Sequence, residues 1–300
     1  MNIKYPYLQL VVANLIWGGN FVIGRAVSDQ LPPITLSFFR WLIALIVVLI
    51  IFRKQLPSKE EIKQMPSKDW WYIGSMAISG VIGFNTLLYI ALNYTTSINA
   101  SLVFAATPVV IGILSLIILR EKLKKNQVLG IFCTFWGVIY IISKGTLTTL
   151  ASLSFNRGDI IVILAVLAWG LYSIIVRHTK QLPFFSTFVL SIVMGVVVLL
   201  PLFIWEITRP GNVIIWSGFS ILSILYVGIV ASIVAFILWN SAIIEIGPIK
   251  SSVFLNLIPV FAALFAVFFN NEVLARYQLI GGIIVILGVY LSTLNSHNSD

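Results

Sequence analysis

The fold is decided by a stretch of sequence that occurs twice. Residues 108–130 read PVVIGILSLIILREKLKKNQVLG, and residues 259–281 read PVFAALFAVFFNNEVLARYQLIG. At a constant offset of 151 positions, the copies share residues that an apolar chain does not match easily by chance: Pro108/Pro259, Glu121/Glu272, Gln127/Gln278 and Gly130/Gly281. The chain therefore consists of two related halves.

The similarity continues outward from these copies. Leu31-Pro32 matches Leu182-Pro183 at the same offset, and Trp17-Gly18 matches Trp169-Gly170 at an offset of 152. These matches predict a first repeat over residues 1–143 and a second over residues 157–300. Residues 144–156, rich in Ser and Thr, are the predicted extracytoplasmic linker.

Composition places both halves in a lipid bilayer. Of the 300 residues, 59% are hydrophobic and only 10% are charged, whereas soluble domains carry roughly a quarter charged residues. The mean hydropathy is +1.03. The net charge of +9 does not indicate nucleic-acid binding, because the charged residues lie mostly in short loops between apolar runs.

Apolar runs of about 20 residues predict helices that cross the hydrocarbon. The ten predicted spans cover residues 8–27, 34–52, 70–92, 97–119, 127–143, 159–177, 184–205, 213–238, 250–269 and 277–294. Five spans per half is an odd number, so the second half enters the membrane from the opposite side. The predicted fold is an all-α integral membrane protein of ten transmembrane helices in two inverted five-helix repeats, a plan that recurs in secondary transporters.

Lysine and arginine residues set the predicted orientation. With the N-terminus inside, 13 of them lie on the cytoplasmic side and five on the other. Loops rich in Lys and Arg stay in the cytoplasm. We therefore expect a multi-pass protein of the plasma membrane with both termini cytoplasmic.

Ordered motifs along the chain resemble the EamA-domain proteins of the drug/metabolite transporter superfamily. The motifs are Asn14-Leu15-Ile16-Trp17-Gly18-Gly19-Asn20-Phe21, Phe39-Arg40-Trp41, Thr107-Pro108, Leu119-Arg120-Glu121-Lys122-Leu123, Ala168-Trp169-Gly170, Asn256-Leu257-Ile258-Pro259-Val260 and Asn271-Glu272-Val273-Leu274. The resemblance implies two EamA repeats and the export or exchange of amino acids or other metabolites. It also implies a central pathway between spans 3, 4, 8 and 9, with spans 1 and 6 contributing.

Polar and aromatic side chains inside these spans are the candidate substrate contacts. Trp17 and Asn20 are three residues apart, whereas Asn85 and Tyr89 are four apart, so each pair shares a helix face. The predicted contacts are Trp17, Asn20, Asn85, Tyr89, Asn99, Trp169, Tyr172, Trp239, Ser252 and Asn256, with Asn240 beside Trp239 at the end of the eighth span. The alternative for the buried amides is hydrogen bonding between helices.

Other residues in the spans have structural interpretations as well. Pro108 and Pro259 are predicted hinges, or else simple kinks, because proline removes a backbone hydrogen bond. Arg40 lies one or two turns inside the second span, and we expect it to extend to the membrane interface. Glycines spaced by seven on spans 5 and 10 predict close helix packing, or a homodimer contact through those spans.

The sequence excludes several chemistries. No Asp, Glu or His lies deep in a span, no P-loop is present, and no HExxH or Cys/His cluster occurs. We expect no cofactor, no bound metal and no enzyme activity, since an intramembrane lipid-modifying enzyme would need such groups. The partners are a small-molecule substrate and the bilayer. The alternative to export is import of a vitamin, sugar or nucleoside-type solute.

Overall fold

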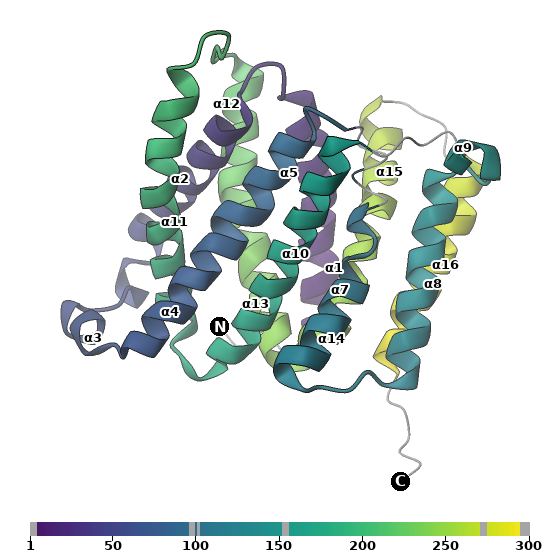
Figure 1. Ribbon diagram of the computed structural model, residues 1–300, viewed down its shortest axis with the longest axis horizontal. Coiled ribbons are helices and arrows are strands. Elements are labelled where there is room, and N and C mark those ends of the chain that lie inside the picture. The colour runs from purple at the N-terminus through teal and green to yellow at the C-terminus, as the bar shows by residue number, and fades with distance from the viewer. Residues whose placement is uncertain (1–4, 96–99, 101–102, 152–155, 271–274, 295–300) are drawn as a thin grey trace.

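The protein is a bundle of helices that stand side by side (Figure 1). The computed structural model describes residues 5–95, 100, 103–151, 156–270 and 275–294, and these contain no strand. Helices suit a bilayer because each bonds its backbone groups within its own segment. The prediction of an all-helical membrane architecture is confirmed.

Within the described ranges, eight helices are long and apolar enough to cross a membrane. They are α1 (Pro6–Ala26), α2 (Pro33–Ile51), the continuous run of α4 (Ser67–Met76), η2 (Ala77–Phe84) and α5 (Asn85–Ala91), α8 (Lys125–Ile142), α10 (Arg157–His178), α11 (Phe184–Ile207), the run of α12 (Gly218–Leu225), η5 (Tyr226–Val234) and α13 (Ala235–Ile246), and α16 (Arg276–Thr293).

The predicted fourth and ninth spans correspond to shorter or broken helices. In the fourth, a turn at residues 105–106 precedes α7 (Thr107–Leu114) and η3 (Ser115–Leu119). In the ninth, the 3-10 turn η6 (Phe254–Asn256) separates α14 (Pro248–Val253) from α15 (Leu257–Asn270). The count of ten crossings therefore stays a prediction.

These breaks change the interpretation of the two prolines. Pro108 lies in the first turn of α7, and Pro259 is the third residue of α15. A proline in the first helical turn removes no intrahelical hydrogen bond. Each proline thus begins a helix after a break and does not kink a continuous one, while its role as a hinge stays a prediction.

The third and eighth spans each contain a π-helical stretch, η2 and η5, at positions that the repeat matches. The eighth span differs from its prediction of 213–238. Ser217 caps its beginning through the backbone N–H of Ser220, and Gly247, with a φ of +84°, follows its last residue. Trp239 and Asn240 therefore lie inside the span, whereas the sequence placed them at its end.

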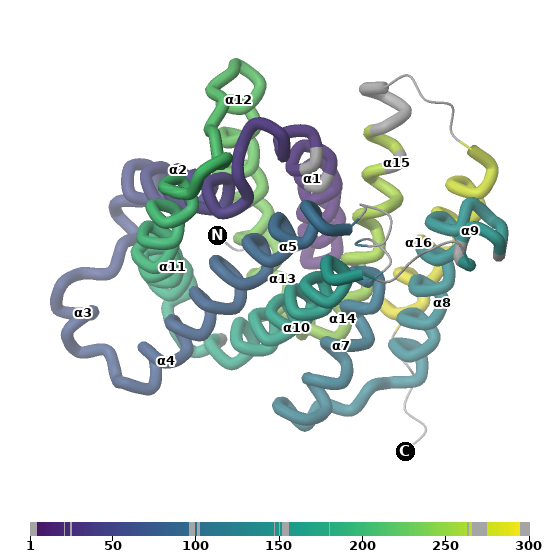
Figure 2. Tube along the Cα trace, turned by 45° about the horizontal axis from the view of Figure 1, so that its top comes forward, coloured from purple at the N-terminus to yellow at the C-terminus, as the bar shows by residue number. Residues whose placement is uncertain are grey.

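Helices from both halves interleave at the centre of the bundle (Figure 2). Helix α1, from the first half, packs mainly against α13 and α15 of the second. Helix α10, from the second half, packs mainly against η2, α5 and α7 of the first. We call these sets the α1 group (α1, α13, α15) and the α10 group (α10, η2, α5, α7).

Helices α8 and α16 form a close pair at one edge of the bundle (Figure 1). A Cβ atom at Gly137 would lie 2.8 Å from Cγ2 of Val285, and one at Gly288 would lie 2.8 Å from the backbone nitrogen of Thr134. The predicted glycine faces therefore pack within the chain. A homodimer through these helices would use their other faces, and it stays a prediction.

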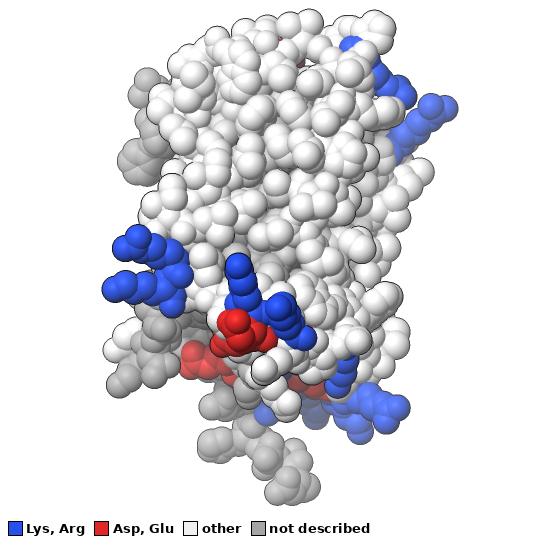
Figure 3. All heavy atoms as spheres, turned by 90° about the vertical axis from the view of Figure 1, so that its left-hand side faces the viewer, with Lys and Arg blue, Asp and Glu red and all other residues white. Residues whose placement is uncertain are grey.

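Short helices and charged residues lie at the ends of the long helices. Helix α3 (Lys59–Gln64) begins with a capping box of Ser58 and Glu61, and α9 (Leu147–Ala151) lies in the predicted linker. Figure 3 shows a broad band without charged side chains, with most charges gathered toward one end of the molecule. This distribution matches a membrane-spanning bundle.

Candidate functional site

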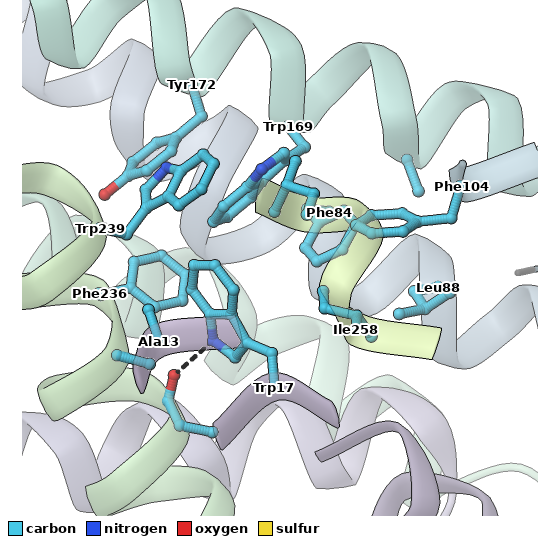
Figure 4. Close-up of a cluster of buried hydrophobic side chains, with 14 of the residues drawn as sticks. Ala13, Trp17, Phe84, Leu88, Phe104, Trp169, Tyr172, Phe236, Trp239 and Ile258 are labelled. Carbon is cyan, nitrogen blue, oxygen red and sulfur yellow. Dashed lines mark hydrogen bonds between the residues drawn. The ribbon is translucent and has the colours of Figure 1, made fainter. Parts of the chain in front are cut away.

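Aromatic side chains meet at the centre of the bundle, between the α1 group and the α10 group (Figure 4). Trp17 and its repeat counterpart Trp169 lie edge to face, with ring centroids 5.2 Å apart. Phe236 and Trp239 of α13 lie 5.7 and 5.5 Å from the Trp17 ring. The Trp17 indole N–H donates to the backbone oxygen of Ala231 at 3.1 Å (Figure 4). Such rings attract each other through complementary faces and edges.

A small cavity opens beside this aromatic cluster. Its lining comes from both halves of the chain: Trp17, Asn20, Phe84, Asn85, Phe104, Trp169, Phe236, Leu255 and Ile258. The volume open to the centre of a water-sized sphere is about 10 Å³, which is room for roughly one water molecule. The protein is therefore closed around the cavity in this conformation, and a metabolite needs it to widen.

Two amide side chains supply polar groups to the mostly apolar cavity. Asn85 donates to the backbone oxygen of Gly80 at 3.2 Å, one turn earlier in the π-helical stretch. Asn20 accepts a hydrogen bond from the Tyr89 hydroxyl at 3.3 Å. The Asn20 NH₂ group and the Asn85 side-chain oxygen have no partner among the described residues, so the cavity offers one donor group and one acceptor. A few polar groups in an apolar pocket are typical of small-molecule sites.

A second tyrosine–asparagine pair lies in the other half. The Tyr172 hydroxyl is 3.0 Å from Oδ1 of Asn240 and 2.7 Å from its Nδ2. At offsets of 152 and 151, Tyr172 matches Asn20 and Asn240 matches Tyr89. The two halves therefore hold equivalent pairs with the residue types exchanged. Each pair joins the α1 group to the α10 group.

Each of these pairs borders a further small cavity of about 10 Å³. One is lined by Gly24, Ser28, Leu31, Pro33, Leu36, Tyr89, Leu92 and Asn93, near the C-terminal ends of α1 and α5. The other is lined by Met76, Val176, Thr179, Phe184, Thr187, Phe188, Asn240 and Ile244, near the C-terminal end of α10. We call them the α1-end cavity and the α10-end cavity. They lie toward opposite ends of the bundle, because α1 and α10 leave the centre in opposite directions (Figure 1).

Arg40 does not extend to the membrane interface, as the sequence led us to expect. It is 1% exposed, and its guanidinium points into the bundle. Nε donates to the Ser232 hydroxyl, Nη1 to the Tyr89 hydroxyl at 3.1 Å, and Nη2 to the Ala231 oxygen at 3.4 Å. The prediction was wrong because these inward partners, from distant segments, are not visible in the sequence around Arg40.

The remaining predicted contacts lie behind or away from the central cavity. Tyr172 stacks on Trp169 at 5.3 Å, and Trp239 packs behind Trp17. The Ser252 hydroxyl donates to the Ile249 oxygen of its own helix at 2.8 Å. Asn256 donates to the Thr134 hydroxyl at 2.9 Å and so joins η6 to α8. Asn99 lies outside the described residues.

The lining residues that the sequence did not indicate are Phe84, Phe104, Phe236, Leu255 and Ile258. Nothing distinguishes them locally from the many apolar residues that pack elsewhere. One signal was available for Phe236, since it matches Asn85 at the offset of 151. No group of three or more His, Cys, Asp or Glu that could hold a metal ion occurs in the described part of the chain.

Known proteins identify the class of molecule. The model of the EamA-like transporter family matches residues 4–143 and again residues 156–294. The "Uncharacterized transporter YyaM" of Bacillus subtilis (strain 168) is 31% identical over 290 residues, which cover 94% of this chain and 92% of that protein. An "Uncharacterized transporter" of Archaeoglobus fulgidus is 28% identical and covers 99% of this chain and 100% of that protein.

A solved structure described as "Crystal structure of protein" shares the fold. Its TM-score is 0.78 at 18% sequence identity, over 97% of this chain and 96% of that one. The resemblance seen in the sequence motifs is thus confirmed, and the chain is a membrane transporter that belongs to the EamA-like transporter family.

Proposed function

We propose that this transporter is a secondary carrier that exports or exchanges small metabolites such as amino acids. It works by alternating access around the central cavity, in the plasma membrane, with both termini in the cytoplasm and without enzyme activity. The observation that carries the proposal is the central cavity itself, which both halves line. The Tyr89–Asn20 pair adjoins it through Asn20, and the equivalent Tyr172–Asn240 pair lies behind its Trp169 wall.

Alternating access requires a barrier on each side that opens while the other stays closed. The Tyr89–Asn20 pair lies between the central cavity and the α1-end cavity, and the Tyr172–Asn240 pair lies toward the α10-end cavity. Both pairs join the α1 group to the α10 group. When these groups rock against each other, one pair separates and the other stays closed, so the solute meets one side at a time.

The energies involved suit such a motion. A buried hydrogen bond contributes about 1 kcal/mol net to stability. Separating one pair therefore costs little, and a bound solute offsets that cost through its own contacts. Two states a few kcal/mol apart are both populated, and a ligand that binds one of them better shifts the balance toward it.

The walls of the cavity favour solutes with an apolar or aromatic part. Trp17, Trp169 and Phe236 present ring surfaces, while Asn20 and Asn85 provide polar groups. Amino acids with apolar side chains combine both properties. Sugars and nucleosides, two of the three solute classes of the alternative function, are the comparison solutes.

The test is counterflow in proteoliposomes that contain the purified full chain. Vesicles are loaded with unlabelled amino acids, sugars or nucleosides, and uptake of the labelled solute is followed. We expect saturable uptake for amino acids and none in vesicles without protein. Saturable uptake of sugars or nucleosides alone would replace the proposed substrate class, and no saturable flux of any solute would refute the proposed carrier function.

A further inference from the structure

We propose that Arg40 binds a carboxylate of the transported solute, so that the substrates are small organic acids, amino acids included. This inference rests on the proposed transport function. It starts from a full positive charge in the interior of the bundle. Arginine side chains keep their charge in proteins, and Arg40 is 1% exposed.

The partners of Arg40 are all neutral. Its guanidinium meets the hydroxyls of Ser232 and Tyr89 and the backbone oxygen of Ala231. The rings of Trp41 and Phe236 lie 5.4 and 5.9 Å from Cζ. No carboxylate within the described ranges forms an ion pair with it. A buried charge without an opposite charge is costly and usually marks a functional site.

The buried acidic residues are engaged elsewhere. Glu206 accepts hydrogen bonds from the backbone nitrogens of Ile34 and Thr35, at the start of α2. Asp159 accepts from the Thr95 hydroxyl and from the backbone nitrogen of Asn156, at the start of α10. Both carboxylates thus stabilise helix N-termini, and neither balances Arg40.

Comparison with Ser191 and Arg177 argues against a purely structural role of Arg40. The repeat matches Arg40 with Ser191, whose hydroxyl bonds to the Phe188 oxygen of its own helix. The architecture therefore does not require a cation at this position. Arg177, by contrast, has an acidic partner, with Nε 3.7 Å from a carboxylate oxygen of Glu121.

Arg40 is also connected to the solute path. Tyr89 links its Nη1 to Asn20, which lines the central cavity. The Ala231 oxygen is shared by Arg40 and the indole N–H of Trp17. An arginine has five N–H donors, and three of those of Arg40 have partners within the described structure. One N–H on each terminal nitrogen remains for a solute once the Tyr89–Asn20 pair separates.

The charge count favours a carboxylate over a phosphate. One guanidinium balances one negative charge, and planar carboxylates pair with it through two parallel hydrogen bonds. A phosphate monoester carries nearly two negative charges at neutral pH. The described lining of the central, α1-end and α10-end cavities includes no cation that would balance the second negative charge of a phosphate.

The test compares acids with their neutral amides. Full-length protein in nanodiscs is titrated with leucine, phenylalanine and 3-phenylpropionate, and with leucinamide, phenylalaninamide and 3-phenylpropionamide, while tryptophan fluorescence is recorded. Counterflow with the same solutes is measured in proteoliposomes. We expect each acid to bind at least about tenfold more tightly than its amide, since hydrogen bonds between charged groups are the strong ones. Phenyl phosphate is the phosphate comparison.

Variants then assign the preference to Arg40. Arg40→Gln should bring acid and amide affinities to within about threefold, whereas Arg40→Lys should keep the preference with weaker binding, because it keeps the charge and loses the planar fork. Arg177→Gln is the matched control, and we expect its acid preference to equal that of the wild type. Size-exclusion profiles establish that each variant is folded. If Arg40→Gln does not fold, the comparison of acids with amides in the wild-type protein still tests the proposal.

The outcomes separate the two proposals. Equal affinities for acids and amides in the wild type would overturn the role of Arg40 while saturable flux still supports transport. A full acid preference in Arg40→Gln would also overturn it, and tighter binding of phenyl phosphate would overturn the assignment of a carboxylate. Absence of saturable flux for every solute, neutral ones included, would refute the transport function and with it this inference.

Discussion

The hydroxyl of Tyr172 donates a hydrogen bond to the side-chain oxygen of Asn240 across 3.0 Å. The first half places Asn20 and Tyr89 at the two matched positions, so that the same contact is made there with the residue types exchanged. The repeat has thus kept the interaction through different side chains. This equivalence underlies the proposed alternating access, in which the two pairs would open in turn.

Removing one tyrosine hydroxyl should favour opening on one side only. Tyr89→Phe keeps the ring but removes the hydroxyl that bonds to Asn20 and to Nη1 of Arg40. A loss of about 1 kcal/mol corresponds to a roughly fivefold population shift. Ser28→Cys, in the α1-end cavity, should then react faster with a membrane-impermeant thiol reagent added outside. Tyr172→Phe should leave that rate unchanged or lower it. Tyr290→Phe, on an exposed face of α16, is the control. Equal rates in Tyr89→Phe and Tyr172→Phe would contradict the assignment of separate barriers.

Asn20 and Asn256 are both predicted substrate contacts, and the structure suggests how to distinguish their roles. Asn20→Ala should lower the flux while membrane insertion stays unchanged, because Asn20 lines the central cavity. Asn256→Ala should also lower the flux, and we expect Thr134→Val to reproduce its effect, since Asn256 bonds to the Thr134 hydroxyl. Michaelis constants and melting temperatures are measured for all three variants. Wild-type flux in Asn20→Ala would remove this residue from the site.

The close pair of α8 and α16 should be sensitive to added volume. Gly137→Val should destabilise the protein by about 1–3 kcal/mol, as overpacking does, because even a Cβ atom there would lie 3.0 Å from the Gly281 oxygen. The matched control is Gly218→Ala, where an added Cβ meets nothing within 4 Å. Thermal unfolding in nanodiscs measures both. A melting temperature of Gly137→Val equal to that of the wild type would argue against this packing.

The predicted orientation can be tested by cysteine labelling. Cys133 is the chain's one cysteine, so Cys133→Ser provides a background without thiols. In that background, Leu150→Cys in the linker should react with an impermeant reagent in intact cells. Lys63→Cys, in the exposed helix α3, should react only after permeabilisation. The reverse pattern would place both termini outside.

Much of the fold could be predicted because its signals are local. A helix in lipid bonds its own backbone, so apolar length alone locates α2, α10 and α11. The capping box of Ser58 and Glu61 needs only four consecutive residues. The breaks before Pro108 and Pro259 were missed, since proline is compatible both with a kink inside a helix and with the first turn of a new one.

By itself, the sequence determined that the chain is an all-helical membrane protein made of two related halves of the EamA-like family. Composition and long-range matches depend only on residue types and their order, so they can be read without the three-dimensional structure. Only the tertiary structure decided which side chains meet. It brought Trp17 to Trp169 and turned Arg40 inward to Tyr89 and Ser232. Helical spacing specifies the face that a residue occupies, whereas packing between distant helices selects the neighbour that this face meets.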